Sequence, residues 1–523
     1  MYNINSKVDK PDIQYMHEKA VKMMRDGIVL NDVEEMYNKF LGIQQELKEN
    51  IQNEYGIVNP NSPQQICRYM ENLDSLEVYE VAYIDGRWSS NRDVMEELVE
   101  LGYKFAEDII AYRKAKKYAE SINSMLKAVN NRTGAVHPTV SLGKTNRINY
   151  SNPALMNIPK KLLWYVVAPR REGNYLYSVD IKNQEPSMLI NLLQIEELKE
   201  ALVSPLGLYE TLFTKVFRQR TKLTVYVTQD EESRVVPATE MSESATIPPV
   251  YYTPIKPSVS SVYYNNEKVK LIEVCNTITR LGEQPLLPEK VSVETVKGNV
   301  YEVDVVWDEI KDRQLKSTGI VEIEGELTGL EIRCVGVIRN EFKMAWNAMT
   351  YGASSFGVKK MCKHIDGDVV YKYFSKIQAF REYKSNCRKL ADKGIQEINT
   401  FFGTKLYAGE PNRNRLQRVL MDLPIQGTGA DILALLLKHF DEEVESRKLT
   451  GLLDIYYPRH DELIIEVNGN WANTVGDDKV KETLRDILEH KIDDWVPFKV
   501  DISRVDVEPL NILDDGGEDI FES

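Results

Sequence analysis

The sequence predicts a multidomain α+β protein with an all-β, sandwich-like domain inserted between its other parts. With 523 residues, the chain is too long for a single hydrophobic core, and roughly two to four domains are expected. Apolar residues recur at helical spacing in 12–55 and 94–130, whereas 218–335 contains short alternating runs such as LTVYV and VYEVDVVW. Short strands at regular spacing are typical of a small β-sandwich or barrel.

The other elements follow from the same periodicities. The segment 131–190 is rich in turn residues and β-formers, and 191–217 returns to helical spacing. Within 218–335, the turn signals TPIKP, PEK and VKGN separate the short strands. The predicted order is therefore helices, a mixed β-rich region, a short helical region, the inserted β domain, and a second mixed region.

Composition indicates a globular protein of a reducing compartment. Charged residues make up 28% of the chain and apolar residues 42%, which is ordinary for a folded domain. No apolar run is long enough to span a bilayer, and the N-terminus does not resemble a signal segment. The five cysteines show no CxxC pair or metal-ligand spacing, so free thiols and a cytoplasmic location without membrane contact are expected.

The formal net charge of −14 argues against a nucleic-acid partner, because DNA binding depends largely on neutralising phosphates. The distribution of charge matters more than its sum. Basic residues gather at 113–117, 170–171, 359–363 and 413–418, whereas the tail 514–523 is acidic. Such a chain is expected to bind DNA in a groove and repel it elsewhere, although basic clusters are most often solvated helix faces.

The most informative segment is YPRHDELIIEV at 457–467, which predicts two short strands joined by a turn that carries Asp461. Similarly, LYSVDIKNQEPSML at 176–189 ends a short strand at Asp180. Two strand-end carboxylates could share a pair of metal ions about 3.5–4 Å apart, as in phosphoryl or nucleotidyl transfer. An aspartate at the end of a strand is, however, most often a solvated turn residue or a helix N-cap.

A third segment, RNEFKMAWNAMTYGASSFG at 339–357, places Arg339, Lys343, Asn347 and Tyr351 at steps of four. These side chains share one helical face. A cationic stripe that ends at an aromatic residue suits a triphosphate, although ordinary surface helices also carry Arg and Lys at this spacing.

Together these segments resemble the motifs of the family A DNA polymerases, in the same order along the chain. The segment before motif A is resembled by TNRINYSNPALMNIP (145–159), and motif A itself by SVDIKNQEP. The Arg339–Tyr351 helix resembles motif B. The Q helix is resembled by LMDLPIQGTGADI (420–432), and motif C by RHDELIIEV. MRDGIVLN (24–31), NPNSPQQI (59–66) and IIAYRKAKKYAESI (109–122) resemble the thumb. The resemblance covers most of the chain except roughly 218–335 and the final dozen residues.

The resemblance implies a right-hand fold of thumb, palm and fingers. The implied parts are the thumb (1–125), the palm with motif A (126–195), the first part of the fingers (196–217), the inserted β-rich domain (218–337), the fingers with motif B (338–400), the palm with the Q helix and motif C (401–510), and an acidic C-terminal tail (511–523). About 270–337 resembles bacterial immunoglobulin-like repeats. A surface insertion without a role is the alternative.

The implied activity is that of a DNA-directed DNA polymerase, which adds deoxynucleotides to a primer 3′ end with two Mg²⁺ ions that Mn²⁺ could replace. Asp180 and Asp461 would be the catalytic metal ligands, with the backbone carbonyl of Ile181. Direct contact between Glu462 and a metal is not assumed. No 3′–5′ proofreading exonuclease is expected, because the thumb accounts for the residues before the palm.

Two further sets of residues are implied by the same motifs. Nucleotide-binding residues would be Asn183, Glu185, Arg339, Lys343, Asn347 and Tyr351. Primer–template contacts would come from Arg147, Gly352, Arg418, Gln426 and His460. The implied partners are primer–template DNA, deoxynucleoside triphosphates, and a replication or processivity factor bound at the 218–337 insertion or the acidic tail.

Glu185 matches the family's glutamate that crowds the ribose 2′ position. One alternative is a single-subunit RNA polymerase-like enzyme, which would more naturally show a small residue there and HDS instead of HDE. Another is a non-catalytic DNA-binding replication scaffold, which would have lost an aspartate. Departures from the family pattern occur at Asn183, Ser187, Tyr209, Asn347 and Asp422. A small enzyme with a surface-type insertion suits a phage or mobile element acting in a host cytoplasm.

Overall fold

The computed structural model describes residues 10–505, apart from 32, 85, 205–206, 218–219, 230, 237–259, 266, 274–275, 335, 363–364 and 490–494. The acidic tail expected at 511–523 lies outside the described residues. Cys67, Cys362 and Cys387 are free thiols, as the cysteine spacing predicts.

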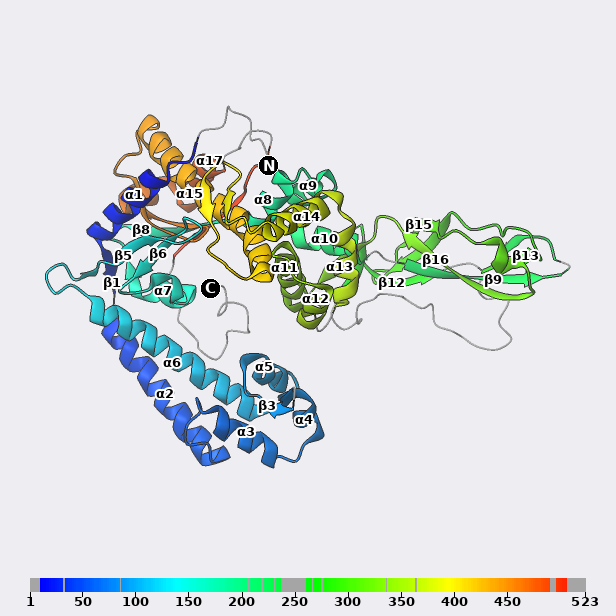
Figure 1. Cartoon of the computed structure of the whole chain (residues 1–523), viewed down its shortest axis with the longest axis horizontal. Helices are drawn as coiled ribbons and strands as arrows, with labels where there is room; N and C mark the ends of the chain where they lie inside the picture. The colour runs from blue at the N-terminus through cyan, green and yellow to red at the C-terminus, as the bar shows by residue number, and fades with distance from the viewer. Residues whose placement is uncertain are drawn as a thin grey trace.

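A four-stranded antiparallel sheet, here called the central sheet, organises the lobe on the left of Figure 1. Its order is β20 (Leu453–Arg459), β21 (Glu462–Val467), β8 (Tyr175–Ile181) and β22 (Val500–Arg504). All six residues of β21 are buried, which explains why ELIIEV reads as a nearly continuous apolar run. The predicted strands of both aspartate segments are confirmed, and they are neighbours in the sheet.

Helices pack around this sheet, and α15 (Arg413–Ser446) is the longest of them. It contacts α1 (Ile13–Asp26), α8 (Gln184–Leu192) and α17 (Asp477–Leu488). In the described part of the chain, α15 alone is long and apolar enough to cross a membrane, and 78% of its apolar window is buried in the fold. Two shorter elements complete this region: α9 (Glu196–Val203) and α16 (Gly469–Val475).

Small sheets connect the central sheet to the elements before it. One sheet consists of β4 (Ala135–Val136), β1 (Ile28–Leu30) and β7 (Val167–Ala168), and the other is the hairpin of β5 (Thr139–Leu142) and β6 (Ile148–Ser151). The short helices η1 (Leu155–Asn157) and α7 (Lys160–Val166) follow the hairpin along the chain. The Tyr150 hydroxyl donates to the carbonyl of Pro458 at 2.9 Å. The Tyr456 hydroxyl donates to the carbonyl of Ala168 at 2.9 Å. These bonds fix α7 beside the ends of the central strands.

A helical arm projects from this lobe (Figure 1). Its shaft is the pair α2 (Val33–Tyr55) and α6 (Lys104–Ala128). Its tip comprises α3 (Pro63–Asn72), α4 (Leu76–Ala82), the hairpin β2 (Tyr83–Ile84) and β3 (Arg87–Trp88), and α5 (Arg92–Glu100). The arm has its own core, which includes Ile51, Ile66, Leu98 and Ile109. The helical periodicity of 12–55 and 94–130 is thus confirmed, while α1 packs against α15 and β20.

A second helical lobe lies beyond α8 and α15 (Figure 1). It contains α10 (Leu208–Val216), α11 (Gly336–Thr350), α12 (Ser355–Met361), α13 (Gly367–Lys376) and α14 (Gln378–Asp392), followed by the hairpin β18 (Glu397–Asn399) and β19 (Lys405–Tyr407). Its core is aromatic: the Phe342 ring lies 5.6 Å from Phe213 and 6.2 Å from Phe374, centroid to centroid. These contacts join the segments before and after the insertion.

The described part of the inserted region is β-rich, as predicted, and extends away from this lobe (Figure 1). Its strands are β9 (Arg220–Thr228), β10 (Arg234–Val236), β11 (Ser260–Tyr264), β12 (Glu267–Glu273), β13 (Asn276–Arg280), β14 (Lys290–Thr295), β15 (Val300–Trp307), β16 (Gly319–Leu327) and β17 (Glu331–Cys334), with η2 (Asp312–Leu315). They are hydrogen-bonded in the order β10-β13-β9-β16-β15-β14-β12-β11-β17. Buried Val and Leu side chains form two small cores, one around Val293 and one around Val225.

One buried carboxylate on α15 gives a prediction about stability. Asp431 is fully buried, and it accepts hydrogen bonds from the hydroxyls of Thr400 and Thr404, the latter at 2.8 Å. Burial raises the pKa of Asp431 to about 6, despite both hydrogen bonds. A raised pKa in the folded state means that this group stabilises the fold most below pH ~4 and loses that contribution as pH rises through 6.

Asp431→Asn should therefore flatten the dependence of unfolding on pH. Between pH 4 and 7 the free energy of unfolding of the variant should rise by on the order of 2–3 kcal/mol relative to that of the wild type. Urea unfolding of both proteins at each pH measures this difference. Other carboxylates titrate alike in both proteins, so the difference isolates Asp431. Parallel curves would show that Asp431 titrates normally.

Candidate active site

The turn between β20 and β21 brings the two predicted aspartates to the same end of the sheet. His460 has a positive φ of 52°, which allows the chain to reverse in a two-residue turn. The backbone N–H of Ile181 donates to the carbonyl of Asp461 at 3.1 Å. Asp180 lies opposite Glu462 in the strand register. The predicted meeting of Asp180 and Asp461 follows from this pairing.

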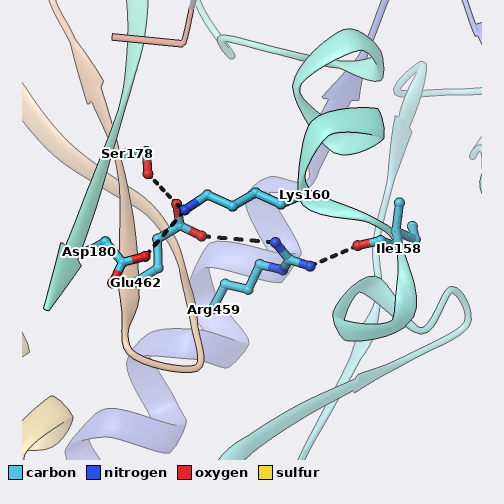
Figure 2. Close-up of polar contacts among 6 residues, drawn as sticks. All are labelled: Ile158, Lys160, Ser178, Asp180, Arg459 and Glu462. Atoms are coloured by element: carbon cyan, nitrogen blue, oxygen red, sulfur yellow. Dashed lines mark hydrogen bonds and ion pairs between the residues drawn. The ribbon is translucent and has the colours of Figure 1, made fainter. Parts of the chain in front are cut away.

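Glu462 is buried, with 3% exposure, and it is surrounded by polar partners (Figure 2). The Ser178 hydroxyl donates to its carboxylate. The Lys160 ammonium lies 2.8 Å from Glu462 Oε1 and 3.3 Å from Asp180 Oδ2. Arg459 Nη1 lies 4.0 Å from the other Glu462 oxygen. Glu462 is therefore neutralised by two cations of the protein itself.

Lys160 is the residue that sequence reasoning missed. It is the first residue of α7, directly after the NIP of the 145–159 segment. Burial opposes its charge, but Glu462 and Asp180 raise the pKa of Lys160 above its usual value, so the ammonium is charged at neutral pH. Arg459 is held by a hydrogen bond to the carbonyl of Ile158 at 2.7 Å (Figure 2). A lysine directly after NIP was the available signal.

The environment of Asp461 differs from that of Asp180. Burial raises the pKa of Asp461 above its ordinary value, whereas the Asp180 side chain is 40% exposed. Within the described residues, no group of three or more His, Cys, Asp or Glu is arranged to hold a metal ion. Lys160 pairs with both Glu462 and Asp180, but the contact with Asp180 is longer and Asp180 is far more exposed, so Asp180 is the more accessible of the two to a cation.

Glu185 stands at the start of α8, which follows β8 directly. Asn183 adopts a left-handed conformation with φ 50°, and this bend turns the chain from strand into helix. Arg147 Nη2 donates to Glu185 Oε1 at 2.7 Å, and the Tyr351 hydroxyl donates to Glu185 Oε2. Burial and the Glu185 charge raise the pKa of Tyr351 well above its usual value. Three of the predicted site residues thus form one hydrogen-bonded group.

Asp422, one of the departures from the family pattern, lies close to this group. Burial and the charge of Glu185 raise the pKa of Asp422 to about 6, while Arg147 and a hydrogen bond from Gln426 oppose the shift. One Asp422 oxygen is buried without a hydrogen-bond partner in the described residues. The sequence predicts Gln426 as a primer–template contact; in the structure it binds Asp422.

Arg339, Lys343 and Asn347, which were predicted to share one helical face, lie on α11. Arg339 forms an ion pair with Glu210 at 2.9 Å and lies over the ring of Tyr209, 5.4 Å from its centroid. Asn347 accepts the N–H of Tyr351 through its backbone carbonyl at 3.1 Å. Lys343 is half-buried on the same helix. Tyr209, one of the departures from the family pattern, thus contacts Arg339.

Gly352 lies two residues after the end of α11, in a conformation that favours glycine, with φ 85°. A Cβ atom at this position would lie 2.9 Å from Met421 Sδ and 3.6 Å from Arg418 Cγ. The predicted contacts Gly352 and Arg418 are therefore neighbours. A small pocket lined by Arg147, Gln184, Gly429, Pro458 and His460 brings two more predicted contacts together.

His460 is neutral at physiological pH. Desolvation, with the charges of Arg147 and Arg459, lowers the pKa of His460 to about 4. A neutral imidazole can both donate and accept a hydrogen bond, which suits contact with a primer end.

One of the basic clusters expected to meet DNA has another role. Arg170 donates hydrogen bonds to the carbonyls of Gly27, Met23 and Tyr456 at 2.9–3.0 Å, and it stacks on the Tyr456 ring at 4.1 Å. These contacts occupy its guanidinium inside the fold. Arg170 thus has partners within the protein, and charge counting alone cannot distinguish such a cation from one that is free to meet a phosphate.

Two protein-family models match this chain. The model of "DNA polymerase family A" matches residues 30–232 and 331–506, and that of "Bacterial Ig-like domain (group 4)" matches 272–330. The family A match is interrupted at 233–330, which lies within the predicted insertion of 218–337, and the Ig-like match falls inside this interruption.

Curated relatives match shorter segments. DNA polymerase I of Caldicellulosiruptor bescii is 29% identical over 188 residues, which is 34% of this chain and 21% of the relative. DNA polymerase I of Deinococcus radiodurans is 30% identical over 111 residues, 20% of this chain and 11% of the relative. The alignments thus span about a fifth or less of these relatives' length.

A solved structure resembles nearly the whole fold. The "POL domain of Pol1 from M. smegmatis complex with DNA primer-template and dNTP" has a TM-score of 0.59 at 17% identity, covering 95% of this chain and 70% of that one. This likeness shows that the chain has the fold of a polymerase domain. Because the family model matches most of the residues outside the insertion, the chain belongs to DNA polymerase family A.

Proposed function

We propose that this protein synthesises DNA on a template, adding deoxynucleotides to the 3′ end of a primer. The observation that carries the proposal is the strand pairing of β8 with the β20–β21 hairpin. It supports a site in which Asp180 and Asp461 adjoin the group of Arg147, Glu185 and Tyr351. The family match supplies the reaction class, and the M. smegmatis relative was solved with primer–template and dNTP.

Asp180 and Asp461 would hold two Mg²⁺ ions, together with the carbonyl of Ile181. The donor set fits, because Mg²⁺ prefers carboxylate oxygen ligands, and the Lys160 ammonium beside Asp180 indicates that this edge accepts a positive charge. When bound, such ions lower the pKa of the attacking hydroxyl and stabilise the leaving oxygen. A neighbouring cation would also favour the ionised form of Asp461, whose pKa burial raises.

The residues of α11 would bind the triphosphate. Arg339 and Lys343 would neutralise its oxygens and the charge that develops on pyrophosphate. For this, Arg339 would exchange its ion pair with Glu210 for a phosphate, a bidentate contact that suits a guanidinium. Asn347 and Tyr351, further along the same face, would adjoin the sugar and base.

Glu185 would select the deoxyribose. The carboxylate is fixed by Arg147 and Tyr351, so it cannot easily turn away from a 2′-hydroxyl. Gly352, Arg418, Gln426 and His460 would contact the primer–template with Arg147, at minor-groove acceptors that every base pair presents. The absence of 3′–5′ exonuclease activity is part of this proposal.

The decisive experiment is primer extension on a primed DNA template with Mg²⁺, with deoxy- and ribonucleotides in parallel. Incorporation of deoxynucleotides, and little of ribonucleotides, is the expected result. Degradation of a mismatched primer without nucleotides would contradict the absence of an exonuclease. Preferential ribonucleotide use would support the RNA polymerase-like alternative.

The insertion is proposed to bind a replication partner and to be dispensable for chemistry. Acidic residues outnumber basic ones in 218–335, which disfavours a direct grip on phosphates. The chain leaves the helical lobe after α10 and re-enters it at α11, and these helices are in contact. The ends of the insertion are therefore close enough for a short linker.

Replacing 218–335 by a Gly/Ser linker should leave single-nucleotide addition near the wild-type rate. Products per binding event in a trap assay should become shorter, more so with the natural partner, because a second contact raises effective concentration. Loss of single-nucleotide addition would show that the insertion supports the catalytic lobe. Equal product lengths with and without partner would favour an insertion without a role.

A further inference from the structure

Lys160 occupies a position between two acidic groups of the site (Figure 2). Its ammonium is 2.8 Å from Glu462 and 3.3 Å from Asp180. The first residue of α7 carries it, and α7 is held beside the strand ends by the packing of the 145–159 segment. A cation of the protein therefore lies against one of the two proposed metal ligands.

The two contacts of Lys160 are unequal. The Glu462 side chain is 4% exposed, and a buried carboxylate is strongly destabilising without a paired cation. The Asp180 side chain is 40% exposed and its contact with Lys160 is longer, so water or another cation can replace the lysine there at little cost. Lys160 is thus anchored to Glu462, and its contact with Asp180 is the one that can be exchanged.

We propose that Lys160 is a positioning residue that competes with divalent cations for Asp180 and keeps Glu462 out of the metal ligand set. This inference rests on the proposed function. When a metal binds, the ammonium leaves Asp180 and remains on Glu462. Asp180 and Asp461 would then hold the ion, and Glu462 would act on it only through Lys160.

The expected consequence is a weakened metal affinity in the wild-type protein. The positive charge of Lys160 repels a divalent ion at Asp180, and the ion must displace the lysine before it binds. Because both side chains of this contact are more than one-third exposed, solvent screening keeps the effect moderate. Removing the charge should tighten binding about three- to tenfold.

The test is a titration of the full chain with Mn²⁺ in the absence of DNA. Electron paramagnetic resonance of the free ion measures how much Mn²⁺ is bound. In Lys160→Met the dissociation constant for the Asp180 site should fall about three- to tenfold. Lys160→Arg, which keeps the charge, should bind Mn²⁺ like the wild type. The Mg²⁺ concentration that gives half-maximal primer extension should fall in Lys160→Met in the same proportion.

Lys182→Met is the matched control. Lys182 lies two residues after Asp180 and pairs with Asp501 at 2.6 Å, so its removal takes away a nearby positive charge without freeing Asp180. Its Mn²⁺ affinity should stay close to that of the wild type. An equal gain in Lys182→Met and Lys160→Met would overturn the proposal, since general charge would then explain both.

Unchanged or weaker Mn²⁺ binding in Lys160→Met also overturns it. If that variant unfolds, the pair Glu462→Gln and Lys160→Met/Glu462→Gln replaces it: the double variant should bind Mn²⁺ more tightly than the single one, and equal affinity refutes competition. Failure of the proposed function itself would give a different result. Asp180 would then not be a metal ligand, and Asp180→Asn would bind Mn²⁺ as tightly as the wild-type protein.

Discussion

Replacing Asp180 by alanine is expected to reduce primer extension by about 10²–10³-fold, and Asp461→Ala should do the same. Loss of one group that stabilises transition-state charge commonly costs 10²–10³-fold in rate, and each variant loses a ligand of the proposed metal pair. The measurement is single-turnover extension of a primed DNA template with saturating Mg²⁺ and deoxynucleotides.

Folding and DNA affinity should survive these substitutions. In Asp180→Ala, Lys160 keeps its shorter ion pair with the buried Glu462, so no buried charge is left alone. In Asp461→Ala, the lost carboxylate is one whose ionised form burial already disfavours. DNA affinity, measured by fluorescence anisotropy, should change little, because neither carboxylate is expected to contact phosphates.

Asp501→Ala is the matched control for both variants. Asp501 lies beside Asp180 in the sheet, on the opposite neighbouring strand, and its side chain is 68% exposed and paired with Lys182. Its removal should leave extension near the wild-type rate. Near-wild-type extension by Asp180→Ala or Asp461→Ala would refute the metal assignment, whereas loss of extension in all three would indicate a general effect of charge at this end of the sheet.

The position of the two aspartates was predictable because local patterns determine it. The short β-rich run before Asp180 and the apolar arms around Asp461 specify strands, and the tight turn at His460 fixes the register of β20 against β21. The insertion was likewise visible as a change from helical to β periodicity. Its nine-strand order was not, because strand order depends on pairing between segments distant in sequence.

The partners of the site residues could not be predicted for the same reason. Lys160 follows the NIP segment without a periodic signal, and its role depends on the packing of α7 beside β8 and β21. Arg170 belongs to a basic pair in the sequence, yet three carbonyls from separate segments bind it. Motifs identify which residues share a site, and tertiary packing decides what each one contacts.

The second large effect is expected at Glu185. Glu185→Ala should raise ribonucleotide incorporation relative to deoxynucleotide incorporation about 100-fold, a size typical of discrimination over one hydroxyl group. The carboxylate is held by Arg147 at 2.7 Å and by Tyr351, so its crowding of the 2′ position depends on a rigid arrangement. The measurement is the ratio of kcat/KM for ribonucleotides to kcat/KM for deoxynucleotides. A ratio is needed because Arg147 and Tyr351 both lose Glu185 as their partner, which should lower the rate with either nucleotide.

Two further variants separate crowding from charge. Tyr351→Phe keeps Glu185 but removes one of its hydrogen bonds, and a looser carboxylate should lose only part of the discrimination. Asp422→Asn removes a neighbouring negative charge without opening space at the sugar, so its ratio should match the wild type. If Asp422→Asn reproduces the effect of Glu185→Ala, sugar selection depends on the acidic charge of this region, and an unchanged ratio in Glu185→Ala would remove Glu185 from sugar selection altogether.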